Sequence, residues 1–212
     1  MPSTKSIIIS CAGIGSRLGL GKTKALIDIA GKSLIHWQLE LLKDVKDIRI
    51  VIGYQSNDVI KEVLKVRKDV IFIYNHNYFE TKTGASFYLG SKHANEYVIE
   101  WDGDLLIHPE DVKQCLETDG EYICYSEKVS EESVYVKTNT QGDVLSFSRE
   151  NGDFEWTGPA CIKRNKIKYT HKNVFNQLEK YLPIKGLKIR AQDIDTYEDY
   201  KKAIDFVKSW KK

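Results

Sequence analysis

The chain has 212 residues, 42% of them hydrophobic, and its 32 Lys plus Arg nearly balance 30 Asp plus Glu. This length suggests one large domain whose core is stable without disulfides or metals. The near-neutral charge argues against a nucleic-acid-binding protein, because such proteins concentrate basic residues on one surface.

The sequence shows no membrane or secretion signal. Its first apolar run, residues 7–9, is too short for the apolar part of a signal peptide, and no later stretch approaches the roughly 20 apolar residues of a membrane span. The four cysteines form no CxxC pair and are typical of reduced, buried thiols. We therefore expect a cytoplasmic protein that does not contact membranes.

Short apolar runs alternate with helical patterns in the first half of the chain. Strands are expected at residues 6–11, 47–53, 70–74 and 97–101. Helices are expected from Ser33 onward, around residues 60–64 and over residues 85–94. This alternation predicts βαβ units and a parallel sheet covered by helices on both faces.

The pattern changes after about residue 120. Strands are expected at residues 122–125, 133–137, 144–148 and 157–162, with no helices between them. They either add antiparallel strands to the same sheet or form a lobe beside it. The last helix is expected to begin after Thr196 as its N-cap, with Asp199 completing a capping box.

A glycine-rich loop, CAGIGSRLGLGKTKAL from residue 11, follows the first predicted strand. Glycines at this point let backbone N–H groups approach a phosphate. The dinucleotide pattern GxGxxG fails at Leu18, and the P-loop pattern fails at Ser16. Arg17 and Lys24 remain as two cations that suit a triphosphate. An ordinary turn with two solvated basic residues is the alternative.

The run AGIGSRLGLGKTKALIDIAGKSLIHWQLELL resembles the signature of the nucleotidylyltransferase family, AAGxGxRx…PKxL…GKPLI. Thr23 replaces the usual proline, and Cys11 replaces a frequent alanine. The segment between Arg17 and Lys24 is shorter than in many sugar-phosphate members. The best-matching branch contains small cytidylyltransferases acting on phosphocholine and similar substrates, which share the Tyr-rich segment at 75–80 and the IDxxxDY pattern at 194–200.

The resemblance implies an α/β fold with a three-layer, Rossmann-like, mostly parallel but mixed sheet. It also implies a single domain over residues 1–212. Residues 1–118 would form the nucleotide-binding half, and residues 119–212 the acceptor-binding half plus the C-terminal helix.

The resemblance also implies roles for individual residues. Arg17 would hold the departing β- and γ-phosphates, and Lys24 would stabilise charge around the α-phosphorus, which makes both catalytic. The implied nucleotide-binding residues are Ala12, Gly13, Gly15, Ser16, Tyr54, Thr83, Gly84, Ala85, Ser86 and Asp102. For residues 83–86 an ordinary helix start with Thr83 as N-cap is an equal alternative.

Two carboxylates, Asp102 and Asp104, follow the fourth predicted strand. Such a pair can face a hard cation such as Mg²⁺, although a surface turn is the commoner use of Asp-Gly-Asp. By motif, Asp104 matches the family's metal-holding aspartate, and Asp195 before the last helix matches the second metal ligand. An acid before a helix also stabilises its N-terminus without any metal. The expected cofactor is Mg²⁺ on Asp104 and Asp195.

The expected reaction transfers CMP from CTP to a small phosphorylated acceptor such as phosphocholine and releases pyrophosphate. Aromatic side chains can cage a quaternary ammonium, and the candidates are Tyr78, Phe87, Tyr88, Trp101 and Trp156. The alternatives are a sugar-1-phosphate nucleotidylyltransferase, a nucleotide-sugar-dependent glycosyltransferase and a catalytically inactive nucleotide-binding domain. The expected partners are a nucleoside triphosphate and the phosphorylated small molecule, and a homodimer is left open.

Overall fold

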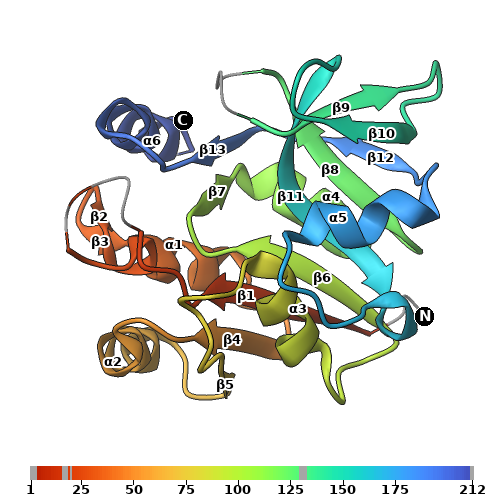
Figure 1. Cartoon of the computed structure of the whole chain (residues 1–212). Coiled ribbons are helices and arrows are strands. Elements are labelled where there is room, and N and C mark those ends of the chain that lie inside the picture. Colours follow the sequence, from red (N-terminus) through yellow and green to blue (C-terminus); the bar gives the residue numbers. More distant parts are fainter. Residues whose placement is uncertain (1–3, 16–18, 20, 129–132, 211–212) are drawn as a thin grey trace.

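The structure is a computed structural model that describes residues 4–15, 19, 21–128 and 133–210. Its centre is a mixed nine-stranded sheet (Figure 1). Seven strands follow one another in the order β10-β9-β11-β6-β1-β4-β5; β8 branches from β11, and β12 pairs with β8. The strands of this sheet are β1 (Lys5–Cys11), β4 (Ile48–Ile52), β5 (Ile71–Tyr74), β6 (Tyr97–Asp102), β8 (Tyr122–Ser126), β9 (Tyr135–Thr138), β10 (Val144–Ser148), β11 (Phe154–Lys163) and β12 (Gly186–Lys188).

The four strands of the first half are parallel, and the second half joins them through antiparallel pairing. β1 pairs with β4 and β6, and β4 pairs with β5, all in parallel. β11 runs antiparallel to β6, β8 and β9. The predicted second-half strands therefore extend the same sheet, and the expectation of a mostly parallel, mixed sheet is confirmed.

Helices cover both faces of the sheet. Because successive side chains of a strand point to opposite faces, Ile7 and Ile9 pack with helices α1 (Leu34–Leu41), α2 (Ser56–Val66) and α4 (Pro109–Glu117). Ile8 packs on the other face with α3 (Thr83–Ser91) and α5 (Val174–Leu178). All three isoleucines are fully buried, as expected for a strand covered on both faces. The three-layer prediction is confirmed.

The C-terminal helix α6 (Tyr197–Ser209) begins as the sequence predicts. Thr196 is its N-cap, and its side chain forms the reciprocal capping box with Asp199. The helix packs on a short hairpin, β2 (Asp28–Ile29) and β3 (Lys32–Ser33), and on α1. This third cluster lies apart from the two cores that flank the sheet.

The boundaries of α3 differ from the prediction. The helix begins at Thr83 rather than Ala85 and ends at Ser91, before Lys92 as C-cap. Its N-cap is Lys82, so the alternative with Thr83 as N-cap is wrong. The Thr83 hydroxyl instead accepts a hydrogen bond of 3.2 Å from the backbone N–H of Val174.

Several short elements have no counterpart in the prediction. β7 (Leu105–Ile107) pairs antiparallel with β13 (Ala191–Asp193). Helices α4 and α5 and strand β12 were also not expected. Three one-turn 3₁₀ helices lie at η2 (Lys24–Leu26), η3 (Arg164–Lys166) and η4 (Glu179–Tyr181). The β7–β13 pair matters most, because it brings the segment before α6 to the edge where β6 ends.

The four cysteines are free and buried, as predicted. Among the helices within the described ranges, none combines the length and apolar character needed to cross a bilayer.

Candidate active site

The glycine loop and the paired aspartates leave the sheet side by side. β1 and β6 are parallel neighbours in which Ser10 lies opposite Asp102, and ligands of open α/β sheets bind beyond such strand ends. The backbone N–H of Gly103 donates to the carbonyl oxygen of Ser10 at 3.1 Å. A Cβ atom on Gly103 would lie 2.4 Å from that oxygen, so the close approach of the two strand ends requires glycine.

Lys24, Asp104 and Asp195, which the sequence places far apart, meet at this edge. The ammonium nitrogen of Lys24, in η2, lies 2.7 Å from Oδ2 of Asp104 and also pairs with Oδ1 of Asp195. Burial alone would lower the pKa of Lys24, but the charges of the two carboxylates outweigh it and raise that pKa. Lys24 is therefore a fixed cation held between two carboxylates.

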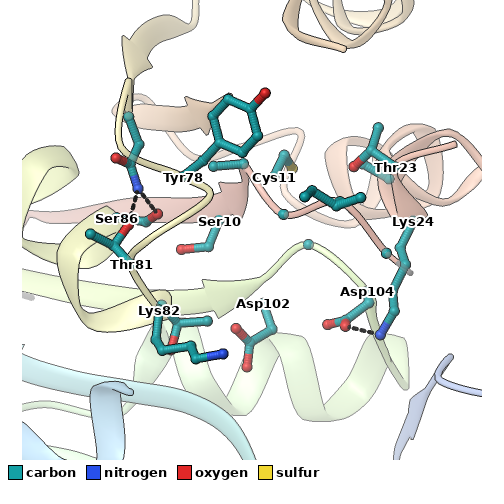
Figure 2. Close-up of a pocket in the computed structure, with 18 of the residues that line it drawn as sticks. Ser10, Cys11, Thr23, Lys24, Tyr78, Thr81, Lys82, Ser86, Asp102 and Asp104 are labelled. Carbon is teal, nitrogen blue, oxygen red and sulfur yellow. Dashed lines mark hydrogen bonds and ion pairs between the residues drawn. The ribbon is translucent and has the colours of Figure 1, made fainter. Parts of the chain in front are cut away.

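Two cavities of about 440 Å³ each lie at this edge. We call the first the loop cavity; it is lined by residues 10–15, 23–25 and 102–104, by parts of the 75–86 segment and by Asn173 (Figure 2). We call the second the acidic cavity; it is lined by parts of the segments 133–134, 149–157, 173–175 and 192–199. Thr83, Asp102, Asp104 and Asn173 line both. A group in one cavity can therefore meet a group in the other at these four residues.

Three residues of the predicted glycine loop, Ala12, Gly13 and Gly15, line the loop cavity. Gly15 has a φ of +68°, and a Cβ atom there would lie 3.1 Å from the carbonyl oxygen of Lys22, so the chain itself requires glycine. A Cβ atom on Gly13 would meet nothing within 4 Å. Ser16 and Arg17 lie outside the described residues.

The side chain of Gln55 holds the far end of this loop, a contact that the sequence analysis missed. Its Oε1 accepts from the backbone N–H of Thr23 at 2.9 Å, and its Nε2 donates to the carbonyl oxygen of Gly21 at 3.0 Å. The near end is held by the N–H of Tyr54, which donates to the carbonyl of Ala12 at 3.1 Å. Thr23 thus uses the N–H group that the family's usual proline lacks. The one local signal is that Gln55 lies two residues after the predicted strand end.

The residues predicted to hold a base separate into two groups. Thr83 and Ser86 line the loop cavity. The N–H of Gly84 donates to the carbonyl of Lys172, and that of Ala85 donates to the carbonyl of Lys82, so neither amide is available to a base. Both residues are buried and line neither cavity.

Tyr54 does not line the loop cavity either. Its ring lies 6.3 Å, centroid to centroid, from that of Tyr78, which does line it. Phe79, also on the lining, is 80% exposed. The aromatic side chains at the mouth of this cavity therefore come from the 75–80 segment, with Tyr54 behind them.

Buried carboxyl groups surround the junction of the two cavities. Burial, reinforced by the charge of Asp104, raises the pKa of Asp102 to about 7. Burial and the charge of Asp102 raise the pKa of Glu100 well above its usual range, and burial together with the charge of Asp104 does the same for Asp193. Glu100 and Asp193 therefore keep their protons to a higher pH than exposed carboxyl groups do, which lowers the negative charge at the junction.

The acidic cavity carries six acidic side chains and one basic side chain, Arg149, among the described residues. Trp156 and Phe175 supply its aromatic surface.

Of the predicted cage candidates, only Trp156 lines this cavity. Phe87 and Trp101 are fully buried in the core, Tyr78 lines the loop cavity, and the ring of Tyr88 packs on that of Tyr169.

The glycine loop after β1 thus lies beside the aspartate pair at the end of β6, at the carboxyl edge of the sheet. The sequence model of the MobA-like NTP transferase domain family matches residues 7–186. The chain belongs to this family.

Two curated relatives illustrate the similarity. The choline-phosphate cytidylyltransferase of Streptococcus pneumoniae is 37% identical over 106 residues, which cover 46% of this chain and 44% of that protein. The bifunctional protein GlmU of Sulfurimonas denitrificans is 23% identical over 185 residues, covering 84% of this chain and 41% of that protein. The matches span less than half the length of either relative.

Solved structures share the fold over nearly the whole chain. The inositol-1-phosphate CTP transferase from T. maritima has a TM-score of 0.82 at 17% identity, covering 98% of this chain and 97% of that one. The CTP:phosphocholine cytidylyltransferase from Streptococcus pneumoniae has a TM-score of 0.76 at 20% identity, covering 96% and 99%. These similarities confirm the Rossmann-like class of the fold.

Proposed function

We propose that this chain transfers a cytidylyl group from CTP to a phosphorylated acceptor with a positively charged head group, such as phosphocholine, and releases pyrophosphate. The observation that carries the proposal is the acidic, aromatic cavity that joins the loop cavity at Asp102 and Asp104. The nucleotide would occupy the loop cavity, and the acceptor would occupy the acidic cavity.

The chemistry of the acidic cavity supports a cationic acceptor. Six acids line this cavity, whereas the nearby cations among the described residues are Arg149 on the lining and Lys24, which pairs with Asp104 and Asp195, so acidic groups outnumber cations. Trp156 is half-buried, and its ring is held edge-on by Phe147 at 5.4 Å between centroids. A fixed indole face beside carboxylates attracts a quaternary ammonium group.

The loop cavity supports the nucleotide side of the proposal. The open space at Gly13, where the chain's own packing does not require glycine, matches a backbone that leaves room for a phosphate. The choice of CTP rests on the names of the relatives, because a curated relative and both solved structures described above are cytidylyl- or CTP transferases.

In the proposed reaction, an oxygen of the acceptor phosphate forms a bond to the α-phosphorus of CTP. The bond from that phosphorus to the oxygen bridging to the β-phosphorus breaks, and pyrophosphate leaves with the bonding electron pair. The acceptor phosphate is already ionised, so no side chain has to remove a proton. Positioning and charge stabilisation by Lys24 and the loop amides then account for the catalysis.

The donor set at the junction fits Mg²⁺. Oxygens of Asp104 and Asp195 already converge on one cationic centre, the ammonium group of Lys24. Magnesium is held in many phosphoryl-transfer sites by one or two carboxylates together with substrate phosphates and water. When bound, it would neutralise charge on the transferred phosphoryl group.

The proposal is tested by measuring pyrophosphate release with Mg²⁺ for each of the four nucleoside triphosphates. Each is paired with phosphocholine, phosphoethanolamine, glycerol 3-phosphate and glucose 1-phosphate. We expect turnover with CTP and the two cationic acceptors. Turnover with glucose 1-phosphate alone would indicate the sugar-1-phosphate branch, which the GlmU relatives represent. No turnover with any pair would indicate an inactive nucleotide-binding domain.

A matched pair of variants locates the acceptor. Trp156→Ala should raise KM for the cationic acceptor at least tenfold, which corresponds to the loss of one cation–π contact, and leave KM for CTP unchanged. Tyr74→Ala, which removes a half-exposed aromatic ring from the edge strand β5, is the control. Equal KM values for the acceptor in the two variants would contradict the placement of the head group.

A further inference from the structure

Lys82 presents an ammonium group to the loop cavity. It is the N-cap residue of α3, its side chain is exposed, and it lines this cavity. Figure 2 shows the side chain directed across the cavity toward Asp102. With the residues that the structure describes, this ammonium makes no hydrogen bond or ion pair. The sequence analysis singled out residues 83–86 and passed over the lysine directly before them.

The backbone that carries Lys82 is firmly held. Its N–H donates to the carbonyl of His171 at 3.2 Å, and the N–H of Gly84 donates to the carbonyl of Lys172 at 3.1 Å. The side chain of Gln177 donates to the carbonyl of Gly84 at 3.0 Å. A Cβ atom on Gly84 would lie 2.5 Å from the carbonyl oxygen of Lys172. The base of the lysine side chain is thus fixed to residues 171–177, while its tip points into open space.

The charges around the cavity need a second cation. Lys24 and Lys82 are the two cationic side chains among the described residues that line it. The single charge of Lys24 already faces two carboxylates, those of Asp104 and Asp195. An incoming triphosphate adds further negative charge beside these carboxylates, and the ammonium of Lys82 is the group placed to oppose it.

The position of Lys82 selects one phosphate. Its neighbour Thr83 lines both cavities, as does Asp102, toward which the lysine points. The phosphorus that exchanges its bond must lie where the two cavities meet. On the proposed function, that atom is the α-phosphorus of the nucleotide.

We infer that Lys82 binds a non-bridging oxygen of the α-phosphate opposite Lys24, which makes it a second cation at the α-phosphate. This inference rests on the proposed function for its role in turnover, but its contact with a phosphate can be measured separately. The ammonium donates a hydrogen bond and transfers no proton in this step. It stabilises charge on the α-phosphoryl group while the bond to the acceptor oxygen forms and the bond to the leaving pyrophosphate breaks.

The first test measures binding, which is independent of turnover. The affinities of CMP and of cytidine are determined by calorimetry for the wild-type protein, Lys82→Ala and Lys82→Arg. Lys82→Ala should weaken CMP about tenfold, the size expected for one charge-assisted hydrogen bond at an exposed site. Cytidine lacks the phosphate, so its affinity should not change, and Lys82→Arg should restore most of the CMP affinity. Unchanged CMP affinity in Lys82→Ala, or no CMP binding to the wild-type protein, overturns the inference.

The second test measures turnover. Lys82→Ala should lower kcat by 100-fold or more and change KM for the acceptor little, because the contact strengthens in the transition state. The rate ratio between the two CTP diastereomers that carry sulfur on the α-phosphate should also change, which a merely structural role would not cause.

The matched control for both tests is Lys92→Ala. Lys92 is the C-cap of the same helix and lines neither cavity. A Lys82→Ala variant as active as Lys92→Ala would refute the catalytic role while leaving the proposed function intact. An inactive wild-type protein that still shows the CMP difference would instead refute the proposed function.

Discussion

Lys24 and Asp104 lie 80 positions apart in the chain, yet 2.7 Å separates the ammonium nitrogen of one from a carboxylate oxygen of the other. The distance follows from the parallel pairing of β1 with β6, which brings the loop after one strand beside the turn after the other. Asp195 completes the group from a third segment. The ion pairs of the site therefore form because the sheet brings distant segments together, and no single sequence motif contains them.

Lys24→Ala should lower kcat by about 100- to 1,000-fold and raise KM for CTP far less, as expected for a group that stabilises charge developing in the transition state. Steady-state kinetics with the acceptor identified above measures the two effects. Lys22→Ala is the control, because Lys22 is exposed on the same loop and does not line the loop cavity. An effect confined to KM would show that Lys24 binds substrate without assisting the chemical step.

Asp104→Asn and Asp195→Asn should each abolish turnover with Mg²⁺ and leave the circular dichroism spectrum unchanged. Each substitution keeps the size of the side chain and removes one anionic oxygen ligand. Addition of EDTA to the wild-type protein should stop the reaction, and excess Mg²⁺ should restore it. Asp205→Asn, on the exposed face of α6, is the control. Near-normal activity of Asp104→Asn would show that the metal is held elsewhere.

Glu100→Gln should become more stable than the wild-type protein as the pH rises. Burial raises the pKa of Glu100 in the folded state, so the folded protein keeps this proton to a higher pH than the unfolded chain, which releases it above the ordinary pKa of 4.5. The wild-type protein therefore loses about 1.4 kcal/mol of unfolding free energy per pH unit above that value, relative to a neutral glutamine. The loss ends where the pH reaches the pKa of the folded state.

Urea unfolding between pH 5 and pH 8 in EDTA measures this difference. Glu198→Gln, at an exposed site on α6, is the control. Parallel stability curves for Glu100→Gln and the wild-type protein would mean that Glu100 is ionised in the folded state.

Gln55→Glu should lower kcat/KM for CTP by about five- to thirtyfold, which corresponds to one or two lost hydrogen bonds. A carboxylate can still accept from the N–H of Thr23, but it meets the carbonyl of Gly21 as a second acceptor. The far end of the glycine loop and Lys24 then lose part of their positioning. Activity equal to the wild-type value would show that the loop needs no such support.

A second pair of variants separates this effect from stability. Gln55 has a φ of +50°, a conformation that glycine adopts without strain. Gln55→Gly and Gln55→Ala should lose activity equally, and Gln55→Gly should be more stable by up to about 1 kcal/mol. Thermal unfolding and kinetics on the same samples provide both values. If the less stable of the two variants were also the less active, the loss of activity would instead reflect a general loss of stability.

The parts of the fold that the sequence predicts correctly are encoded locally. Ile7 to Ile9 form an apolar run long enough to identify β1, and Thr196 with Asp199 form a capping box within one turn. Only the family resemblance predicts that Asp195 and Asp104 meet at one site, where both pair with Lys24, because their convergence depends on pairing of the three-residue strands β7 and β13. Strands this short carry no periodicity that identifies them.

The candidate site shows the same division. Lys24 and Asp104 stand in recognisable motifs. In contrast, Lys82 and Asn173 reach the loop cavity, and Gln55 reaches the glycine loop, only through the packing of distant segments. Gly84 resembled a ligand-binding glycine but is required by the carbonyl of Lys172. A glycine in sequence does not reveal whether a ligand or the chain itself fills the space beside it.

Gly103 determines the geometry of the Asp-Gly-Asp segment. The two aspartates carry the chemistry, and the missing side chain between them sets the gap between two strand ends. An engineer seeking another metal preference can vary either carboxylate, but any residue other than glycine at the middle position would move both carboxylates at once. The spacing of the two aspartates is thus set by the packing of the strand ends. A redesigned protein could replace either aspartate, but it would have to retain the glycine.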